Sequence, residues 1–211
     1  MRTKQWIVAV LLLCLTGLAY GQNMKALEIH VGTLNPKDTP SGMLLGGSYG
    51  ISVDETVDIS LGAFYFWKSY SETSAIDTGI TPGGTHITQT QQTLDYHTSL
   101  LPVSANVTVH FPVAQKLNVY AGGGISYQFL WNKEENLVDD VESSRFFKGF
   151  GWVGRAGIEY LLGSRSSFIV EAYYNGCKVK GNKSEEAGLP TWDEVNVTGL
   201  GIRGGVRLLI F

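Results

Sequence analysis

The stretch LNVYAGGGISYQFLW, residues 117–131, decides the fold class of this chain. Its odd positions are apolar, aromatic or glycine, from Leu117 to Trp131, whereas its even positions are mostly polar or glycine, apart from Tyr120 and Leu130. This alternation with a period of two is typical of a β-strand with one apolar face. The strands of soluble proteins usually have roughly five or six residues. A run of about fifteen therefore indicates an unusually long strand.

The same alternation recurs in seven other segments, so we predict eight strands. They lie near residues 27–32, 43–53, 57–68, 101–111, 117–131, 152–160, 168–175 and 200–210. Short connections at 54–55, 112–116 and 163–166 alternate with longer polar ones at 35–40, 71–91, 132–147 and 178–194. This order is typical of a barrel with periplasmic turns and extracellular loops. We predict an all-β fold: an eight-stranded antiparallel up-and-down transmembrane β-barrel with four extracellular loops.

Strand length and aromatic positions support this interpretation. Ten residue steps, from Leu117 to Tyr127, span about 33 Å of strand. A tilt of about 45° turns this into a rise of about 23 Å, close to the ~25 Å apolar band of an outer-membrane barrel. Aromatic residues cluster at the loop ends (Tyr65, Trp67, Tyr127, Phe129, Trp131) and at the turn ends (Phe111, Tyr160, Phe168). We expect two aromatic belts.

The first residues have the features of a secretory signal. Arg2 and Lys4 precede an apolar run at residues 7–13, and the sequence Ala-Tyr-Gly at 19–21 supplies a small-x-small cleavage pattern. The alternative, a transmembrane anchor, needs about twenty apolar residues. We predict a cleaved signal peptide at residues 1–21 and a barrel domain at residues 22–211.

Composition narrows the function classes. Removing Arg2 and Lys4 from 16 basic residues leaves 14 against 19 acidic ones, and no basic stripe appears, so we expect no nucleic-acid partner. Glycine makes up 26 of 211 residues, about 12% against a usual ~7%, and the glycines are spread through the predicted strands. We expect Gly122 and Gly124 to face inward and make room for large neighbours such as Tyr120, Phe64 and Tyr173.

At this point the chain resembles the small eight-stranded outer-membrane β-barrel domain proteins of the porin-like superfamily. The resemblance lies in VYAGGGISYQF, GFGWVGRAGIEYLLG, FIVEAYYN and the C-terminal GGVRLLIF, and it covers residues 24–211. It implies a bacterial outer-membrane location, contact with outer-membrane lipids and insertion by the outer-membrane assembly machinery. That machinery reads an aromatic C-terminal strand, so the resemblance makes Phe211 the assembly signal. The sequence departs from the pattern in one respect, because Phe211 has inward parity if Ile210 faces lipid.

Several catalytic motifs are matched without the context that they need. The two G-x-G-x-x-G matches, at 149–154 and 199–204, open no helical pattern, which dinucleotide binding requires. The G-x-S-x-G match centred on Ser48 lies within a strand, although Glu28 and His30 would share its lumen. The histidines show no metal-ligand spacing. We expect no cofactor, no metal and no catalytic residue.

Charged residues of both signs have inward parity. Acids and bases in so narrow an interior should pair, because an unpaired buried charge costs several kcal/mol. We predict a salt-bridged polar core that closes the lumen; the alternative is a selective ion path. The predicted lumen charge cluster consists of Glu28, Asp58, Lys68, Arg155, Glu159, Glu171, Arg203 and Arg207.

We therefore expect a monomeric, non-enzymatic integral outer-membrane protein with a structural or surface-contact role carried by its loops. The alternatives are a lipid-modifying hydrolase and a narrow pore or small-ligand transporter. A soluble lipocalin-like barrel would need the reverse alternation, apolar inside and polar outside. The loops carry no motif that identifies an extracellular ligand.

Overall fold

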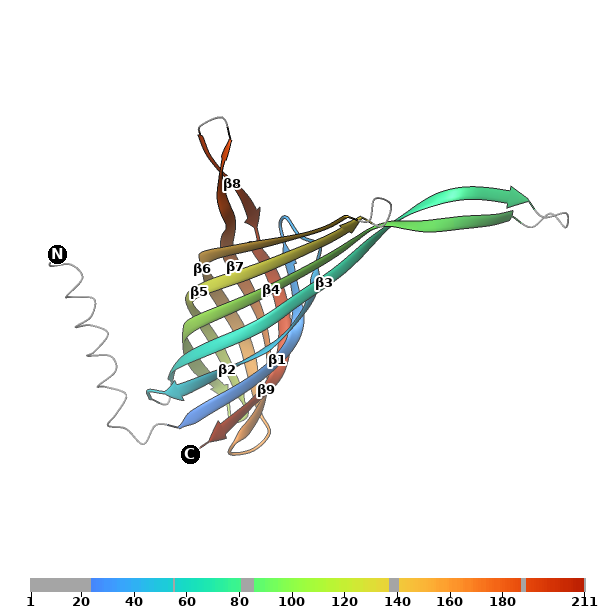
Figure 1. Ribbon diagram of the computed structural model, residues 1–211. Helices are drawn as coiled ribbons and strands as arrows, with labels where there is room; N and C mark the ends of the chain where they lie inside the picture. The colour runs from blue at the N-terminus through green and yellow to red at the C-terminus, as the bar shows by residue number, and fades with distance from the viewer. Residues whose placement is uncertain (1–23, 55, 81–85, 137–140, 187–188, 211) are drawn as a thin grey trace.

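The computed structural model describes residues 24–54, 56–80, 86–136, 141–186 and 189–210, whose regular structure is entirely β (Figure 1). The strands are β1 (Lys25–Pro36), β2 (Gly42–Ser52), β3 (Val57–Ile80), β4 (His86–Ala114), β5 (Leu117–Asn136), β6 (Val141–Leu161), β7 (Ser166–Glu186), β8 (Leu189–Asn196) and β9 (Gly199–Ile210). Strands β1 to β7 pair antiparallel in chain order, and β9 pairs with both β7 and β1. Eight strands thus close the predicted barrel, while β8 extends β7 as a hairpin above the wall. No helix in the described part of the chain is long and apolar enough to cross a membrane.

The predicted parity of the strands is confirmed. On β1, Ile29 is 54% exposed whereas its neighbour His30 is 1% exposed, and on β4 Val107 faces out beside the buried Thr108. Outward residues present an apolar surface to lipid, and inward residues fill the barrel. The predicted aromatic residues also lie at the expected ends. Phe111, Tyr160 and Phe168 adjoin the short turns, and Tyr65, Trp67, Tyr127 and Trp131 lie near the opposite end.

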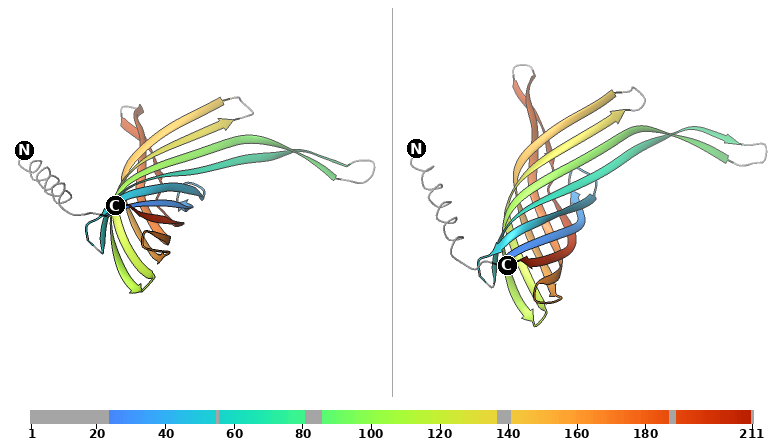
Figure 2. Two further views of the ribbon diagram at one scale, coloured as in Figure 1. Left: turned by 90° about the horizontal axis from the view of Figure 1, so that it is seen from below. Right: turned by 60° about the horizontal axis from the view of Figure 1, so that its bottom comes forward.

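The short connections and the ends of β1 and β9 gather at one end of the barrel. Lys25 lies opposite both Ile51 and Ile210, next to the β2–β3 turn. The long connections project from the other end (Figure 2). In an outer-membrane barrel, short turns face the periplasm and long connections face outward, so the two ends are named accordingly below.

The polar sequence led us to expect loops at the four long connections. Three of them are instead continuations of strand pairs beyond the barrel. The β3–β4 ladder runs on from Ser71 opposite Asp95 to Ile80 opposite His86 (Figure 1). The β5–β6 ladder reaches Asn136 opposite Val141, and β7 pairs with β8 as far as Glu186 opposite Leu189. A two-stranded ladder pairs the facing backbone groups of its strands and leaves the outer ones to water, so it needs no apolar face. Threonine and isoleucine, frequent in residues 71–94, favour extended backbone. The polar composition hid these strands. The first connection, at residues 37–41, is short and irregular.

The glycines make room inside the barrel, but for other neighbours than predicted. A side chain at Gly122 would meet the Val107 carbonyl oxygen at 2.5 Å and the Thr108 hydroxyl at 2.9 Å. A side chain at Gly124 would come 2.5 Å from the Asn106 amide oxygen. The large rings lie beside different glycines: Tyr120 next to Gly157, Phe64 next to Gly46 and Tyr173 next to Gly201. Strand register decides these pairs, and it could not be known before the barrel was closed.

Candidate functional site

The barrel interior brings together seven of the eight predicted lumen charges near the periplasmic end. Strand pairing places two of the acid–base pairs directly opposite each other: Glu28 faces Arg207 across β1–β9, and Glu171 faces Arg203 across β7–β9. The buried members are Glu28, Asp58, Arg155, Glu159, Glu171, Arg203 and Arg207. Inward parity and barrel closure together therefore build this ionic layer.

Arg207 is the centre of the lower part of this layer. Its guanidinium donates to Asp58 Oδ2 and lies 3.5 Å from Glu28 Oε1 and 3.8 Å from Glu159 Oε1. His110 lies between the same acids, with its Nε2 2.9 Å from Asp58 and its Nδ1 3.3 Å from Glu159. One arginine thus links acids from three strands other than its own.

Arg155 and Arg203 form the upper part of the layer. Arg155 lies 3.3 Å from Glu28 and 3.8 Å from Glu171, and its Nη2 donates to Thr108 Oγ1 at 2.5 Å. Arg203 Nε donates to Glu171. The Arg203 guanidinium also lies 4.1 Å from the Phe64 ring centre and 4.6 Å from that of Tyr173. These rings fix it by cation–π contact as well as by charge.

The charge balance of the layer differs from the predicted four acids and four bases. Lys68 is the tenth residue after Asp58 along β3, so it lies about 33 Å further along the strand. It is only half-buried and lines the extracellular mouth. Four carboxylates therefore face three guanidinium groups, and the His110 ring lies between two of these carboxylates. Parity gave the correct face for Lys68, but the height along the strand separates it from the layer.

Neutral polar side chains fill the next level. Gln128 Nε2 donates to Asn175 Oδ1 at 2.5 Å, and Asn175 Nδ2 donates to the Val197 carbonyl oxygen at 2.8 Å. Asn106 donates to Ser104 at 2.9 Å from the facing wall. These residues carry buried amides without charge, between the ionic layer and the level above.

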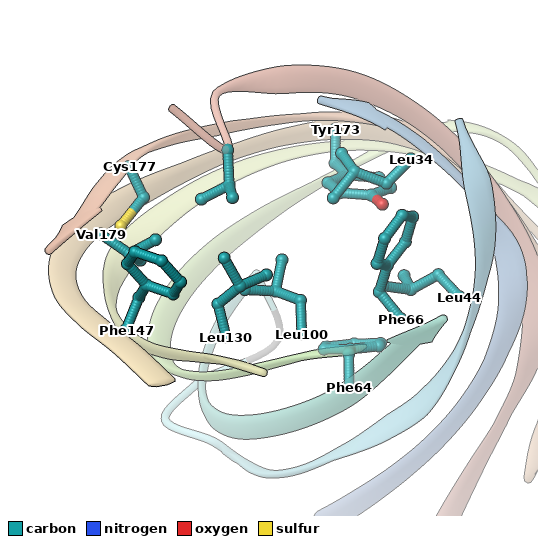
Figure 3. Packing of buried hydrophobic residues seen from close by; sticks show 11 residues of the cluster. Leu34, Leu44, Phe64, Phe66, Leu100, Leu130, Phe147, Tyr173, Cys177 and Val179 are labelled. Atoms are coloured by element: carbon teal, nitrogen blue, oxygen red, sulfur yellow. The ribbon is translucent and has the colours of Figure 1, made fainter. Parts of the chain in front are cut away.

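The extracellular half of the lumen is apolar, which corrects the prediction of a polar core throughout. Side chains from β1 to β7 point inward there and pack together with Val197, which precedes β9 (Figure 3). Leu100 is 0% exposed and Val179 is 0% exposed. The apolar layer comprises Leu34, Leu44, Phe64, Phe66, Leu100, Leu130, Phe147, Tyr173, Cys177, Val179 and Val197. Along β5, for example, the inward residues change from polar to apolar toward the extracellular end, from Gln128 to Leu130.

Above the apolar layer the barrel opens into a vestibule of about 430 Å³. Its floor includes Leu130 and Phe147, and tyrosines and charged groups line its sides. Arg145 lies 3.9 Å from Asp193 on this rim. The side residues include Asp38, Lys68, Tyr70, Tyr96, Arg145 and Asp193. The packed apolar layer forms the base of this hollow.

The residues of the hydrolase alternative do meet, but not in catalytic order. Ser48 Oγ donates to Glu28 Oε2 at 2.8 Å, and His30 Nε2 lies 3.3 Å from the same oxygen. A hydrolytic triad needs the base to accept the serine proton. Here the serine hydroxyl is directed to the carboxylate, and all three residues are buried in the wall.

The other sequence motifs lie within strands. The match at 149–154 is in β6 and the match at 199–204 begins β9, so neither precedes a helix. Among the described residues, no group of three or more histidine, cysteine, aspartate or glutamate side chains is arranged to hold a metal ion. Phe211, the predicted assembly signal, lies outside the described residues, as do residues 1–23.

Sequence reasoning missed His110, Tyr120 and Thr108 as members of the ionic layer. The Tyr120 hydroxyl donates to Glu171 at 2.8 Å. The sequence did contain a feature that could have identified them, because all three residues have the same inward parity as the charged residues. Their partners come from strands that are distant in sequence, and only the closed barrel shows them.

Comparison with known proteins identifies the family and the fold of this chain. The sequence pattern of a family described as outer membrane protein beta-barrel domain matches residues 9–207. No curated protein matches. The outer membrane protein OprG from Pseudomonas aeruginosa has a TM-score of 0.60 at 14% identity, over 89% of this chain and 96% of that one. Neisserial surface protein A has a TM-score of 0.54 at 12% identity, over 90% and 98%. Outer membrane protein W of E. coli has a TM-score of 0.52 at 14% identity, over 90% and 100%. At such identities, the structures show a shared fold alone.

Proposed function

Because this chain belongs to the outer membrane protein β-barrel domain family and resides in the bacterial outer membrane, we propose that it is a non-enzymatic structural and surface-contact protein. It closes its own lumen and presents its vestibule and paired hairpins to the outside. It acts as a monomer, is inserted by the outer-membrane assembly machinery, contacts outer-membrane lipids and binds no nucleic acid.

The observation that carries this proposal is the filling of the lumen at two levels in series. The ionic layer pairs acids and bases across the periplasmic half, and the apolar layer packs side chains across the extracellular half. An eight-stranded barrel has an interior just wide enough for side chains to fill. A path for ions or substrates would have to displace both layers.

The hairpins support a role in surface contact. The β3–β4 pair extends far to one side of the barrel, and the β7–β8 pair rises from its rim (Figure 1). Functional surfaces are commonly carried by connections held on a rigid scaffold. Backbone pairing keeps these hairpins extended, so they can reach beyond the lipid headgroups.

The pore and the hydrolase are supported less well. A pore would need an open lumen, and the buried Ser48 hydroxyl is directed to Glu28 instead of to a base. Both alternatives can be tested on one preparation. The purified protein should give conductance at the background level in planar bilayers and should release no fatty acid from phospholipid or lipopolysaccharide. Discrete conductance steps or steady fatty-acid release would overturn the proposal.

The surface-contact role has its own test. Replacing residues 72–93 by a four-residue Gly-Ser turn should leave a folded barrel, because the wall strands end below that point. Boiled and unboiled samples should still migrate differently on gels. Attachment of expressing cells to host cells or to one another should fall, measured against the intact protein at equal surface amounts. Attachment equal to that of the intact protein would exclude this hairpin as the contact surface.

A further inference from the structure

Three lysines gather on the outer, lipid-facing wall at the extracellular end of β6 and β7. Lys148 lies directly opposite Lys180 in the β6–β7 ladder. Lys178 is two residues from Lys180 on the same face, and their side chains are 60% and 54% exposed. The outward parity of these positions is otherwise apolar, as at Phe150, Trp152 and Val170. This lysine cluster (Lys148, Lys178 and Lys180) interrupts the apolar wall.

The height of the cluster matches the boundary of the hydrocarbon. Phe168 marks the periplasmic aromatic belt on β7, and Lys178 is ten residues further on, or about 33 Å of strand. At a tilt of about 45° the rise is about 23 Å, close to the ~25 Å apolar band. The ammonium groups therefore lie at the level of the outer-leaflet headgroups.

An apolar groove of about 340 Å³ runs down the wall from Lys178. Ile125, Phe150, Trp152 and Tyr174 line it, and the absence of a side chain at Gly176 lets the Trp152 indole lie across β7. The Trp152 and Tyr174 rings are 5.1 Å apart. The groove is thus a rigid aromatic surface with a cation at its upper end.

We propose that this face binds a phosphorylated lipid of the outer leaflet, with an acyl chain in the groove and a phosphate against the lysine cluster. The charge complementarity of the site argues for this occupant. Three ammonium groups face the single carboxylate of Glu194, so the cluster keeps a net positive charge that a neutral lipid would not balance. A soluble anion would not occupy the apolar groove. The proposal goes beyond the structural role above and depends only on the outer-membrane location, not on the sealed lumen.

Glu194 supplies a test that separates this site from a general lysine effect. Its carboxylate lies 3.1 Å from Lys178 Nζ and 3.5 Å from Lys180 Nζ. It occupies the place that a lipid phosphate would take, so the two anions compete. Removing the carboxylate should strengthen lipid binding, although it breaks two ion pairs of the protein.

Binding can be measured by native mass spectrometry of the refolded protein titrated with diphosphorylated lipid A. The pair Lys148→Gln and Lys178→Gln should weaken binding about tenfold or more, since each headgroup-level lysine contributes roughly fivefold. Glu194→Gln should strengthen it severalfold. The matched control, Lys25→Gln with Lys116→Gln at the periplasmic end, removes the same charge and should leave the affinity unchanged. Circular dichroism and the gel shift on boiling confirm that each variant is folded.

Four results would overturn the proposal. They are equal affinity of the lysine variant and the intact protein, weaker binding by Glu194→Gln, equal affinity for dephosphorylated lipid A, and equally effective competition by inorganic pyrophosphate. The third would reduce the site to an apolar groove, and the fourth would make it a site for free phosphate.

Discussion

At the scale of single residues, Arg203 shows how the closed barrel makes one side chain depend on several strands. Its guanidinium is held between Phe64 and Tyr173 and donates to Glu171. Removing one member of a buried ion pair typically costs about 3–5 kcal/mol, because the other charge stays buried without a partner. We predict a loss of this size for Arg203→Leu, measured by urea unfolding from lipid vesicles.

The conservative variant Arg203→Lys distinguishes the effect of the positive charge from that of the planar guanidinium group. Arg203→Lys keeps the positive charge but loses the planar group that lies between two rings, so it should cost less than the leucine variant. The opposite result, a leucine variant more stable than the intact protein, would place Arg203 toward lipid, where an arginine at the midplane costs roughly 2–4 kcal/mol. That result would contradict the inward position.

Asp54 gives a prediction about pH in the periplasmic β2–β3 turn. Its Oδ1 accepts hydrogen bonds from the backbone NH groups of Thr56 and Val57 and from the Thr56 hydroxyl, at 2.7–2.8 Å. These hydrogen bonds, first that from the Thr56 backbone, lower the pKa of the Asp54 carboxyl. A lowered pKa in the folded state means that the stabilisation is present above the unfolded pKa and is lost as pH falls through the folded value.

We therefore expect the Asp54→Asn variant to be less stable than the intact protein at neutral pH, with the difference shrinking below about pH 4. The carboxyl is fully exposed, so the effect is small. Urea midpoints from vesicles between pH 3 and pH 7 measure it. A difference that stays constant over this range would show that the carboxylate does not act through its charge.

At the scale of strands, period-two alternation predicted the wall well. It gave eight strands, their outward faces, the closing contact of the first strand with the last, and the inward parity of the charges. These features follow from local sequence, because one face of each strand meets lipid. The height of a residue along the barrel and the register between strands do not follow from local sequence. Lys68 has the right parity but lies too far along β3 to reach the ionic layer, and the ring neighbours of the glycines depend on pairing between strands.

The sequence-based prediction also failed for the polar strands outside the membrane. The sequence of residues 71–91 has the composition of a loop, yet most of it forms a ladder above the membrane. Outside the lipid, the alternation of apolar and polar residues is not required, so the signal that identified the wall strands is missing there. The apolar layer was missed for a related reason. In the sequence, Leu130 was an exception to the alternation of its strand, and Leu100 lay just before the predicted strand 101–111. Only the folded strands place both residues at one height.

The orientation of the barrel is testable at this scale with two cysteine variants. Ser144→Cys lies on the extended part of β6, and Ser164→Cys lies in the β6–β7 turn; both positions are exposed. A 5 kDa maleimide polymer should label the first on intact cells and the second only after the outer membrane is permeabilised. The native Cys177 is buried and serves as the background. The reverse pattern would invert the topology.

At the scale of the whole molecule, two interior layers of different chemistry fill the lumen at different heights. The ionic layer spans the lumen with paired acids and bases, and the apolar layer excludes water because an apolar constriction dewets. The vestibule lies above both layers, and the hairpins extend from the same end of the barrel. In the proposed function, these two layers in series separate the vestibule from the periplasm.

Barriers in series make a specific prediction about conductance. The pair Phe66→Ser and Leu100→Ser should open the apolar layer, and the pair Glu171→Ser with Arg203→Ser should open the ionic layer while removing one charge of each sign. Either pair alone should leave planar-bilayer conductance at background, because the intact layer still blocks the path. Only the fourfold variant should conduct, once circular dichroism and the gel shift on boiling show that it is folded. Conductance from one pair alone would mean that the remaining layer is no seal, and the closure of the barrel would then rest on a single level.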